Sequence, residues 1–151
     1  MKHRSVGILL AALVFHTALA AADNTLTLHD AWVREAPPGA QVLAGYAQIE
    51  NATDQANAII AVSSTAFEKA EIHRSEVKGG IARMAQIKRL DLPAQKIVKL
   101  EPGGTHLMLI NPKLPLRAGQ HVMLMFTLSS GNTVNVDAEV RNAEQSSEHH
   151  H

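Results

Sequence analysis

The stretch Thr133-Val134-Asn135-Val136-Asp137-Ala138-Glu139-Val140 alternates polar and apolar side chains along its whole length. Successive side chains of an extended strand point to opposite faces, so this alternation predicts a β-strand with one face on a core and the other in water. We expect it to be an outer strand. The rest of the chain shows no long helical period. Together with the alternating stretch, this favours an all-β fold.

Short β-like segments precede this stretch and are separated by turn residues. The turns contain Gly, Pro and Asn, as at Pro37-Pro38-Gly39 and Ser130-Gly131-Asn132. Many short strands at this spacing predict a single-domain β-sandwich or barrel. The predicted strands are Leu26–Val33, Gly45–Glu50, Ala58–Val62, Ala70–Ser75, Ile81–Ile87, Ile97–Leu100, His106–Ile110, His121–Leu128 and Thr133–Val140.

The amino-acid composition excludes several classes of function. The chain has 151 residues, 14 Lys and Arg against 14 Asp and Glu, and no Cys. A balanced charge does not favour a nucleic-acid partner, because binding to phosphate backbones depends on clustered Lys and Arg. Without Cys there is no disulfide, thiolate zinc site, Cys nucleophile or blue-copper centre. Any site for a soft metal must therefore use methionine.

The N-terminus has the pattern of a secretory signal peptide. Basic residues in Met1-Lys2-His3-Arg4 precede an apolar run, Val6–Phe15, and small residues follow. The run is shorter than the roughly 20 residues of a membrane span, so we expect export without stable membrane insertion. Cleavage after Ala20 or Ala22 fits the pattern. Export and the lack of Cys together indicate a bacterial periplasm.

We accordingly divide the chain into three parts. Residues 1–22 are the predicted signal peptide, residues 23–141 the β-domain, and residues 142–151 a disordered tail. The tail ends in His149-His150-His151, which is either native or the remnant of a purification tag and carries no functional argument.

Histidine and methionine recur near the predicted turns. In His106-Leu107-Met108 the imidazole and the thioether share one face of a strand. His73 and Met84 flank a glycine turn and become direct cross-strand neighbours if the hairpin turns between Lys78 and Gly79.

That register carries an unfavourable consequence. It sets Arg74 opposite Arg83, a like-charge pair that a bulge or a longer loop would relieve.

Two imidazoles and two thioethers form a soft, uncharged ligand set that selects Cu(I). Zinc and magnesium prefer other donors. Met residues of β-domains are more often core filler, and we interpret Met123 and Met125 in this way. We interpret His29 and His121 as structural or surface residues.

Catalytic motifs are missing. The strings G-x-S-x-G, G-x-x-x-x-G-K and H-E-x-x-H do not occur, so we expect no enzymatic activity. Asn51-Ala52-Thr53 matches a glycosylation sequon, but we interpret it as a turn.

The four residues also match a family motif. His73, Met84, His106 and Met108 follow the pattern His-x10-Met-x21-His-x-Met of periplasmic copper chaperones of the PCu(A)C type, which the chain resembles. The resemblance covers about Leu26 to Val140. It is also carried by Ala31-Trp32-Val33-Arg34, Gly45-Tyr46, Glu71-Ile72-His73 and the run from Leu100 to Leu109.

The resemblance implies a cupredoxin-like β-sandwich that binds Cu(I) through these four side chains without catalysis. It further implies delivery to a thiolate-containing acceptor, towards the dinuclear copper centre of cytochrome c oxidase. The partner would be an oxidase subunit or a thioredoxin-like assembly factor, and we expect a monomer. Arg74 replaces a Met that is frequent in this family. Trp32, Arg34 and Tyr46 are interpreted as scaffold.

Two alternatives stay open at this point. The chain could be a periplasmic copper buffer or resistance protein without a dedicated acceptor. It could also be a metal-free β-sandwich interaction module in which His and Met only pack.

Overall fold

The computed structural model describes residues 26–142, and these form ten β-strands without a helix. The predicted all-β class is therefore confirmed. The predicted signal peptide and nearly all of the predicted tail lie outside the described residues. The strands are β1 (Thr27–Arg34), β2 (Val42–Asn51), β3 (Asn57–Ser63), β4 (Phe67–Lys78), β5 (Ile81–Gln86), β6 (Leu90–Leu92), β7 (Lys96–Leu100), β8 (Thr105–Pro112), β9 (His121–Leu128) and β10 (Thr133–Arg141).

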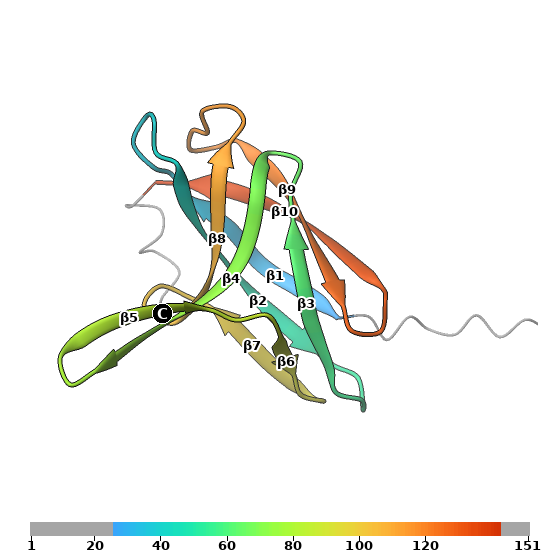
Figure 1. Ribbon diagram of the computed structural model, residues 1–151. Helices are drawn as coiled ribbons and strands as arrows, with labels where there is room; N and C mark the ends of the chain where they lie inside the picture. The colour runs from blue at the N-terminus through green and yellow to red at the C-terminus, as the bar shows by residue number, and fades with distance from the viewer. Residues whose placement is uncertain (1–25, 143–151) are drawn as a thin grey trace, which may run out of the picture.

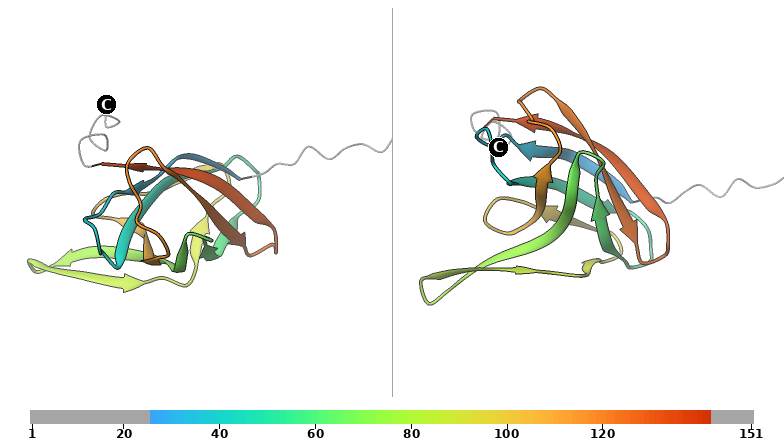
Figure 2. Two further views of the ribbon diagram at one scale, coloured as in Figure 1. Left: turned by 90° about the horizontal axis from the view of Figure 1, so that it is seen from above. Right: turned by 45° about the horizontal axis from the view of Figure 1, so that its top comes forward.

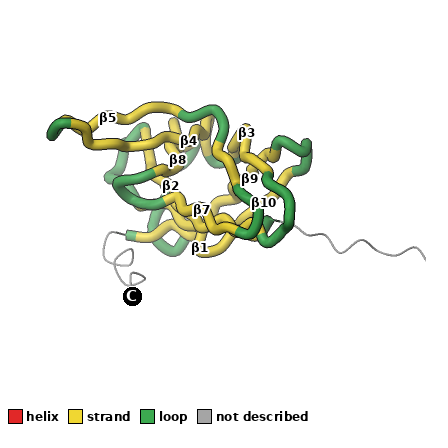
Figure 3. The backbone as a smooth tube through the Cα atoms, turned by 90° about the horizontal axis from the view of Figure 1, so that it is seen from below, coloured by secondary structure: helices red, strands yellow, loops and turns green. Residues whose placement is uncertain are grey.

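The strands form one sheet that rolls around a common interior. Its order is β5-β4-β8-β2-β1-β10-β9-β3-β6, and β7 pairs with β2. Seen from below, the strands surround the interior, with β1 on one side and β4 on the other (Figure 3). The core is filled by aliphatic and aromatic side chains from both sides, among them Val33, Ile49, Leu107, Leu124 and Phe126, all fully buried. Within residues 26–142 no helix has the length and apolarity needed to cross a membrane.

The predicted strands are all present, with ends that shift by a few residues. Strand β6 was not predicted, because its three residues are too few to show a period. In β10 the alternation is confirmed, since Ala138 and Val140 are buried while Asn135 and Asp137 are exposed. Its predicted outer position is wrong, because β10 pairs with β1 on one edge and with β9 on the other.

Two methionines of β9 do not lie in the core. Met123 is 48% exposed and Met125 is 36% exposed. Val122, Leu124 and Phe126 occupy the core face instead. Because side chains of a strand alternate between faces, residues 123 and 125 must point outward. The interpretation of both as core filler is therefore wrong.

The sequon-like segment is a turn, as predicted. The Asn51 side chain is buried, and its Nδ2 donates to the carbonyl oxygens of Gln55 and Leu92, each at 2.9 Å. Its Oδ1 accepts from the backbone N–H of Thr53 at 3.1 Å. Asn51 therefore ties the β2–β3 connection to β6.

Gly45 allows β2 to approach β8 closely. A Cβ atom at this position would lie 3.3 Å from side-chain atoms of Leu107 and Leu109, which is tighter than ordinary packing. Glycine therefore helps to fix the position of β8, the strand that carries His106 and Met108.

The hairpin of β4 and β5 extends away from the rolled sheet, as Figures 1 and 2 show. Every residue of β5 is exposed. Gly79 and Gly80 form its two-residue turn with φ of +59° and +78°. Positive φ at both central residues is the requirement of a type I′ hairpin turn, and glycine adopts it without steric strain.

Candidate metal centre

The structure brings His73 and His106 together. They are direct register partners on the neighbouring antiparallel strands β4 and β8, so both side chains lie on the same face. Their ring centroids are 6.3 Å apart, with ring planes inclined by 35°. One metal ion with metal–nitrogen bonds of about 2 Å can span two rings at this separation.

Met108 joins the two histidines on the same face. It follows His106 by two residues in β8, which is one full period of a strand. Its register partners are Glu71 on β4 and Ala44 on β2. The face that carries the two imidazoles therefore also carries a thioether and a carboxylate.

Met84 lies near this group, but not where the sequence analysis placed it. Its register partner is Ser75, while His73 faces Gln86. The predicted register is wrong because the chain turns at Gly79-Gly80, which pairs Lys78 with Ile81.

The change in register is by two residues, so Met84 keeps the same face as His73 and becomes its diagonal neighbour. Diagonal neighbours are about 7–8 Å apart, within reach of a long side chain. Met84 is 53% exposed.

The observed register also removes the like-charge contact. Arg83 faces Glu76, and Arg74 faces Ala85. Arg74 is on the opposite face of β4 from His73, because adjacent residues of a strand alternate. Its Nε donates to Thr105 Oγ1 at 3.3 Å. The arginine at this position therefore leaves the four-residue group intact.

A carboxylate orients His73. Glu71 Oε2 lies 2.8 Å from His73 Nε2, and Lys69 pairs with the other carboxylate oxygen. The hydrogen bond from Lys69, and then that from His73, lowers the pKa of Glu71. An ionised carboxylate only accepts, so the single proton of the neutral imidazole is on Nε2. Nδ1 then carries a lone pair.

That nitrogen is the atom of interest. His73 Nδ1 is buried and has no hydrogen-bond partner among the described residues. A buried polar atom without a partner is costly, and a metal ligand is one reason for such an atom to be retained.

A backbone carbonyl orients His106 in the complementary way. The Nδ1 of His106 lies 3.0 Å from the carbonyl oxygen of Gly104, which can only accept, so Nδ1 carries the proton and Nε2 the lone pair. The same carbonyl accepts from the Ser75 backbone N–H at 3.1 Å. This bond ties the turn before β8 to β4.

Glu71 and Gly104 were not predicted as orienting groups. The pattern Glu-x-His, which puts a carboxylate and an imidazole on one face of a strand, was the available signal for Glu71. A carbonyl acceptor has no side-chain signal. Within residues 26–142 no three His, Asp or Glu side chains gather as a metal site. The four side chains predicted as ligands carry two imidazoles and two thioethers, which are soft donors of the kind that Cu(I) prefers.

The aromatic residues form scaffold, as predicted. The rings of Trp32 and Tyr46 pack with centroids 4.5 Å apart, and the guanidinium of Arg34 lies 5.8 and 5.6 Å from their centroids. Burial raises the pKa of Tyr46, against a smaller opposing effect of the Arg34 charge. These residues hold β1 against β2.

The family of this chain follows from its similarity to known proteins. The model of the LpqE-like family, described as putative lipoprotein LpqE-like, matches residues 26–140. The chain belongs to the LpqE-like family. A curated relative, the putative lipoprotein Lxx21020 of Leifsonia xyli subsp. xyli, is 30% identical over 112 residues. The match covers 74% of this chain and 66% of that relative.

Solved structures similar to this LpqE-like chain include two of one protein, DR1885 from Deinococcus radiodurans. The solution structure of CuI-DR1885 is 28% identical, with a TM-score of 0.65 over 82% of this chain and 83% of that one. The solution structure of apo-DR1885 is 26% identical, with a TM-score of 0.62 over 94% and 97%.

The fold is also that of solved PCuAC domains. The copper-bound PCuAC domain from PmoF2 has a TM-score of 0.66 at 20% identity and covers 78% of this chain and 92% of its own. Both the resemblance to PCuAC domains and the cupredoxin-like β-sandwich predicted from the sequence are thereby confirmed.

Proposed function

We propose that this LpqE-like chain binds one Cu(I) through His73, Met84, His106 and Met108 and passes it to a thiolate-containing acceptor. The observation that carries the proposal is the pair of opposed imidazoles. Each ring has one nitrogen held by a hydrogen bond and the other left with a lone pair. Fixing one nitrogen orients the other and is the usual arrangement of a metal-binding histidine.

The solved neighbours support copper as the cargo. One is a copper-bound domain, and another is named as the CuI form. The neutral donor set on this chain favours Cu(I), because thioethers are soft ligands and bring no charge. We propose a carrier role with no catalytic step.

Transfer follows from the same chemistry. Two imidazoles and two thioethers leave the bound Cu(I) with its positive charge, whereas thiolates bring negative charge that more than offsets it. Met84 is half-exposed on the projecting hairpin and is the ligand that an acceptor can displace first. We propose that the acceptor is an oxidase subunit bearing the dinuclear copper centre, or a thioredoxin-like assembly factor.

We also propose that the chain works outside the cytoplasm, in the periplasm or an equivalent exported space. The basic start and the apolar run within residues 1–22 support export. The curated relative is named as a putative lipoprotein, which is also consistent with an exported protein.

A Cu(I) competition titration against a chromophoric chelator tests binding. We expect one tight equivalent in the protein, and its loss in a His106→Ala/Met108→Ala variant whose β-sheet circular dichroism is retained. The matched control is His29→Gln. His29 is an exposed histidine of β1 that is not among the four proposed ligands, and its Nε2 lies 3.0 Å from Glu50 Oε2. Equal tight binding by the double variant and the control would reject the ligand assignment.

Transfer needs a separate measurement. The Cu(I)-loaded protein is mixed with a soluble copper domain that holds two reduced cysteines, and the copper content of each protein is measured after separation. Movement of copper to the dithiol protein, faster than its release to buffer, supports a chaperone. Retention of copper by the chain would contradict delivery and favour the copper buffer.

A further inference from the structure

A second group of soft donors lies on β9. His121, Met123 and Met125 alternate with buried residues and share the outward face of the strand. The His121 side chain is 55% exposed, and the two methionines are 48% and 36% exposed. This face is separate from the core, which β9 contacts through Val122, Leu124 and Phe126.

The surroundings of the two thioethers are polar. On β10 the register partners of His121, Met123 and Met125 are Glu139, Asp137 and Asn135. On β3 the partner of Met125 is Ser63. An exposed strand face among such neighbours normally carries polar side chains, as β10 itself does. Hydrophobic burial therefore does not account for the two methionines.

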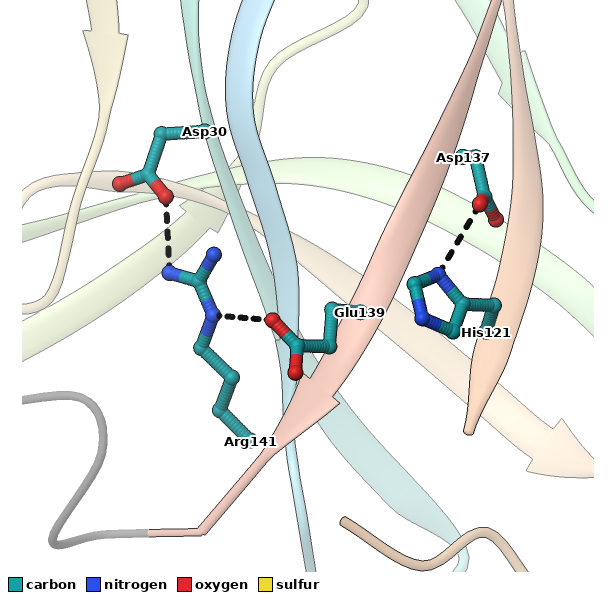
Figure 4. Close-up of polar contacts among 5 residues, drawn as sticks. All are labelled: Asp30, His121, Asp137, Glu139 and Arg141. Atoms are coloured by element: carbon teal, nitrogen blue, oxygen red, sulfur yellow. Dashed lines mark hydrogen bonds and ion pairs between the residues drawn. The ribbon is translucent and has the colours of Figure 1, made fainter. Parts of the chain in front are cut away.

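A carboxylate orients the imidazole of this group. His121 Nδ1 lies 2.9 Å from Asp137 Oδ2, and Figure 4 shows the contact between β9 and β10. With the Nδ1 proton donated to the carboxylate, Nε2 carries the lone pair. The pair Asp137–His121 thus repeats the carboxylate–imidazole arrangement of Glu71–His73, with the two ring nitrogens exchanged.

The spacing repeats as well. His121-x-Met123 has the same separation on a strand as His106-x-Met108, which puts nitrogen and sulfur on one face one period apart. Met125 adds a second thioether one period further on. An imidazole nitrogen and thioether sulfurs are donors for a soft monovalent ion.

We propose that His121, Met123 and Met125 form a second Cu(I) site, distinct from the group on β4, β5 and β8. His121 Nε2 and the Met123 sulfur bind the ion, and the Met125 sulfur completes or extends the site. This site is the weaker of the two, because its donors come from one exposed strand and include a single imidazole. It gives the domain a place to hold a second ion of the same chemistry.

Methionine methyl NMR tests the proposal on the full chain. The chain has five methionines, at positions 1, 84, 108, 123 and 125, so the ε-methyl signals are few and can be assigned by single Met→Leu variants. Cu(I) is added stepwise without oxygen. We expect the Met84 and Met108 signals to move with the first equivalent and those of Met123 and Met125 with the second. Signals of Met123 and Met125 that stay unmoved at three equivalents would overturn the proposal.

A stoichiometry measurement gives an independent readout. We expect Met123→Leu/Met125→Leu to bind one Cu(I) fewer than the unchanged protein, while His29→Gln binds the same number. Both variants keep His149–His151, so copper on that run cancels in the comparison. Leucine preserves size and apolarity at two exposed positions, and unchanged thermal unfolding will verify the fold. An unchanged copper number in the double variant would reject the site.

The proposed function and the β9 site can be rejected independently. In a Met84→Leu/Met108→Leu variant we expect the Met123 and Met125 signals still to move on addition of Cu(I). If they no longer move, the β9 residues do not form a site of their own. If only the Met84 and Met108 signals of the unchanged protein fail to respond, the function proposed above is wrong and the β9 site stands.

Discussion

The two ends of β4 differ in almost every physical respect. From Phe67 to Arg74 the strand pairs with β8, and Phe67 and Ile72 are 2% and 4% exposed. From His73 to Lys78 it pairs with β5, and Val77 is 73% exposed. One strand is therefore a core element at its start and a projecting arm at its end (Figure 1).

His73 is at the junction. It faces His106 on β8 and Gln86 on β5. We call the hairpin of β4 and β5 beyond His73 the arm, and the rolled sheet the body. Of the four proposed ligands, the two histidines and Met108 lie on the body, and Met84 lies on the arm. Segments with few buried contacts open locally at low free-energy cost. The body should therefore set how tightly Cu(I) is held, while the arm should set how readily an acceptor reaches it.

The largest expected effect is on stability and contrasts one buried residue of β8 with one exposed residue of the arm. Leu107 is fully buried, and Leu107→Ala should lower the free energy of unfolding by about 2–5 kcal/mol through lost burial and a cavity. Ile81 is 59% exposed, and Ile81→Ala should cost under about 0.5 kcal/mol. Chemical denaturation of both variants measures the difference. Similar losses would mean that the arm packs as tightly as the body.

The second prediction concerns the carboxylate on the body. Glu71→Gln removes the charge that holds the Nε2 proton of His73, and we expect Cu(I) affinity to fall by about 10–100-fold. The matched control is Glu76→Gln, because Glu76 lies on the arm and pairs with Lys78 at 3.3 Å. The Cu(I) affinity of Glu76→Gln should equal that of the unchanged protein.

A purely structural role for Glu71 would leave the His73 tautomer as it is. ¹⁵N NMR of the imidazole in the copper-free protein should show the proton on Nε2, and a population shifted towards Nδ1 in Glu71→Gln. An unchanged tautomer with unchanged affinity would contradict the orienting role.

The same carboxylate makes the stability depend on pH. The pKa of Glu71 is lowered in the folded protein from 4.5, by Lys69 first and then by His73. A depressed pKa contributes stability that is fully present above the unfolded value and is lost as pH falls through the folded value. Unfolding free energy should therefore decline below about pH 4.5, with a shallower decline in Glu71→Gln. Parallel curves for the two proteins would argue against this contribution.

Sequence patterns predicted the strands and the grouping of the two His–Met pairs, because period-two spacing and turn residues are local signals. The register of β5 was not predictable, since Lys78-Gly79-Gly80 allows the chain to turn at more than one place. The exposure of Met123 and Met125 was hidden for a different reason. The run from Val122 to Phe126 is apolar throughout, so polarity does not mark which face is outward.

The smallest expected effect is a difference in Cu(I) affinity between variants of the two methionines, one on the arm and one on the body. Met108 is partly buried between β2 and β4, whereas Met84 is half-exposed on the arm. We expect Met84→Leu to lower Cu(I) affinity by about tenfold or less, and Met108→Leu to lower it by more, because a fixed donor loses less freedom on binding. Competition titration of the two variants side by side measures this order.

The rate of transfer should separate the same two residues more clearly. If Met84 is the ligand that leaves first, Met84→Leu should speed release of Cu(I) to a dithiol acceptor, because the thioether that the acceptor would displace is already absent. Met108→Leu should mainly weaken binding, since the displaceable thioether on the arm is still present. Stopped-flow transfer at matched copper loading gives both rates. Slower transfer from Met84→Leu would mean that Met84 helps the acceptor to reach the ion and is not the ligand that leaves first.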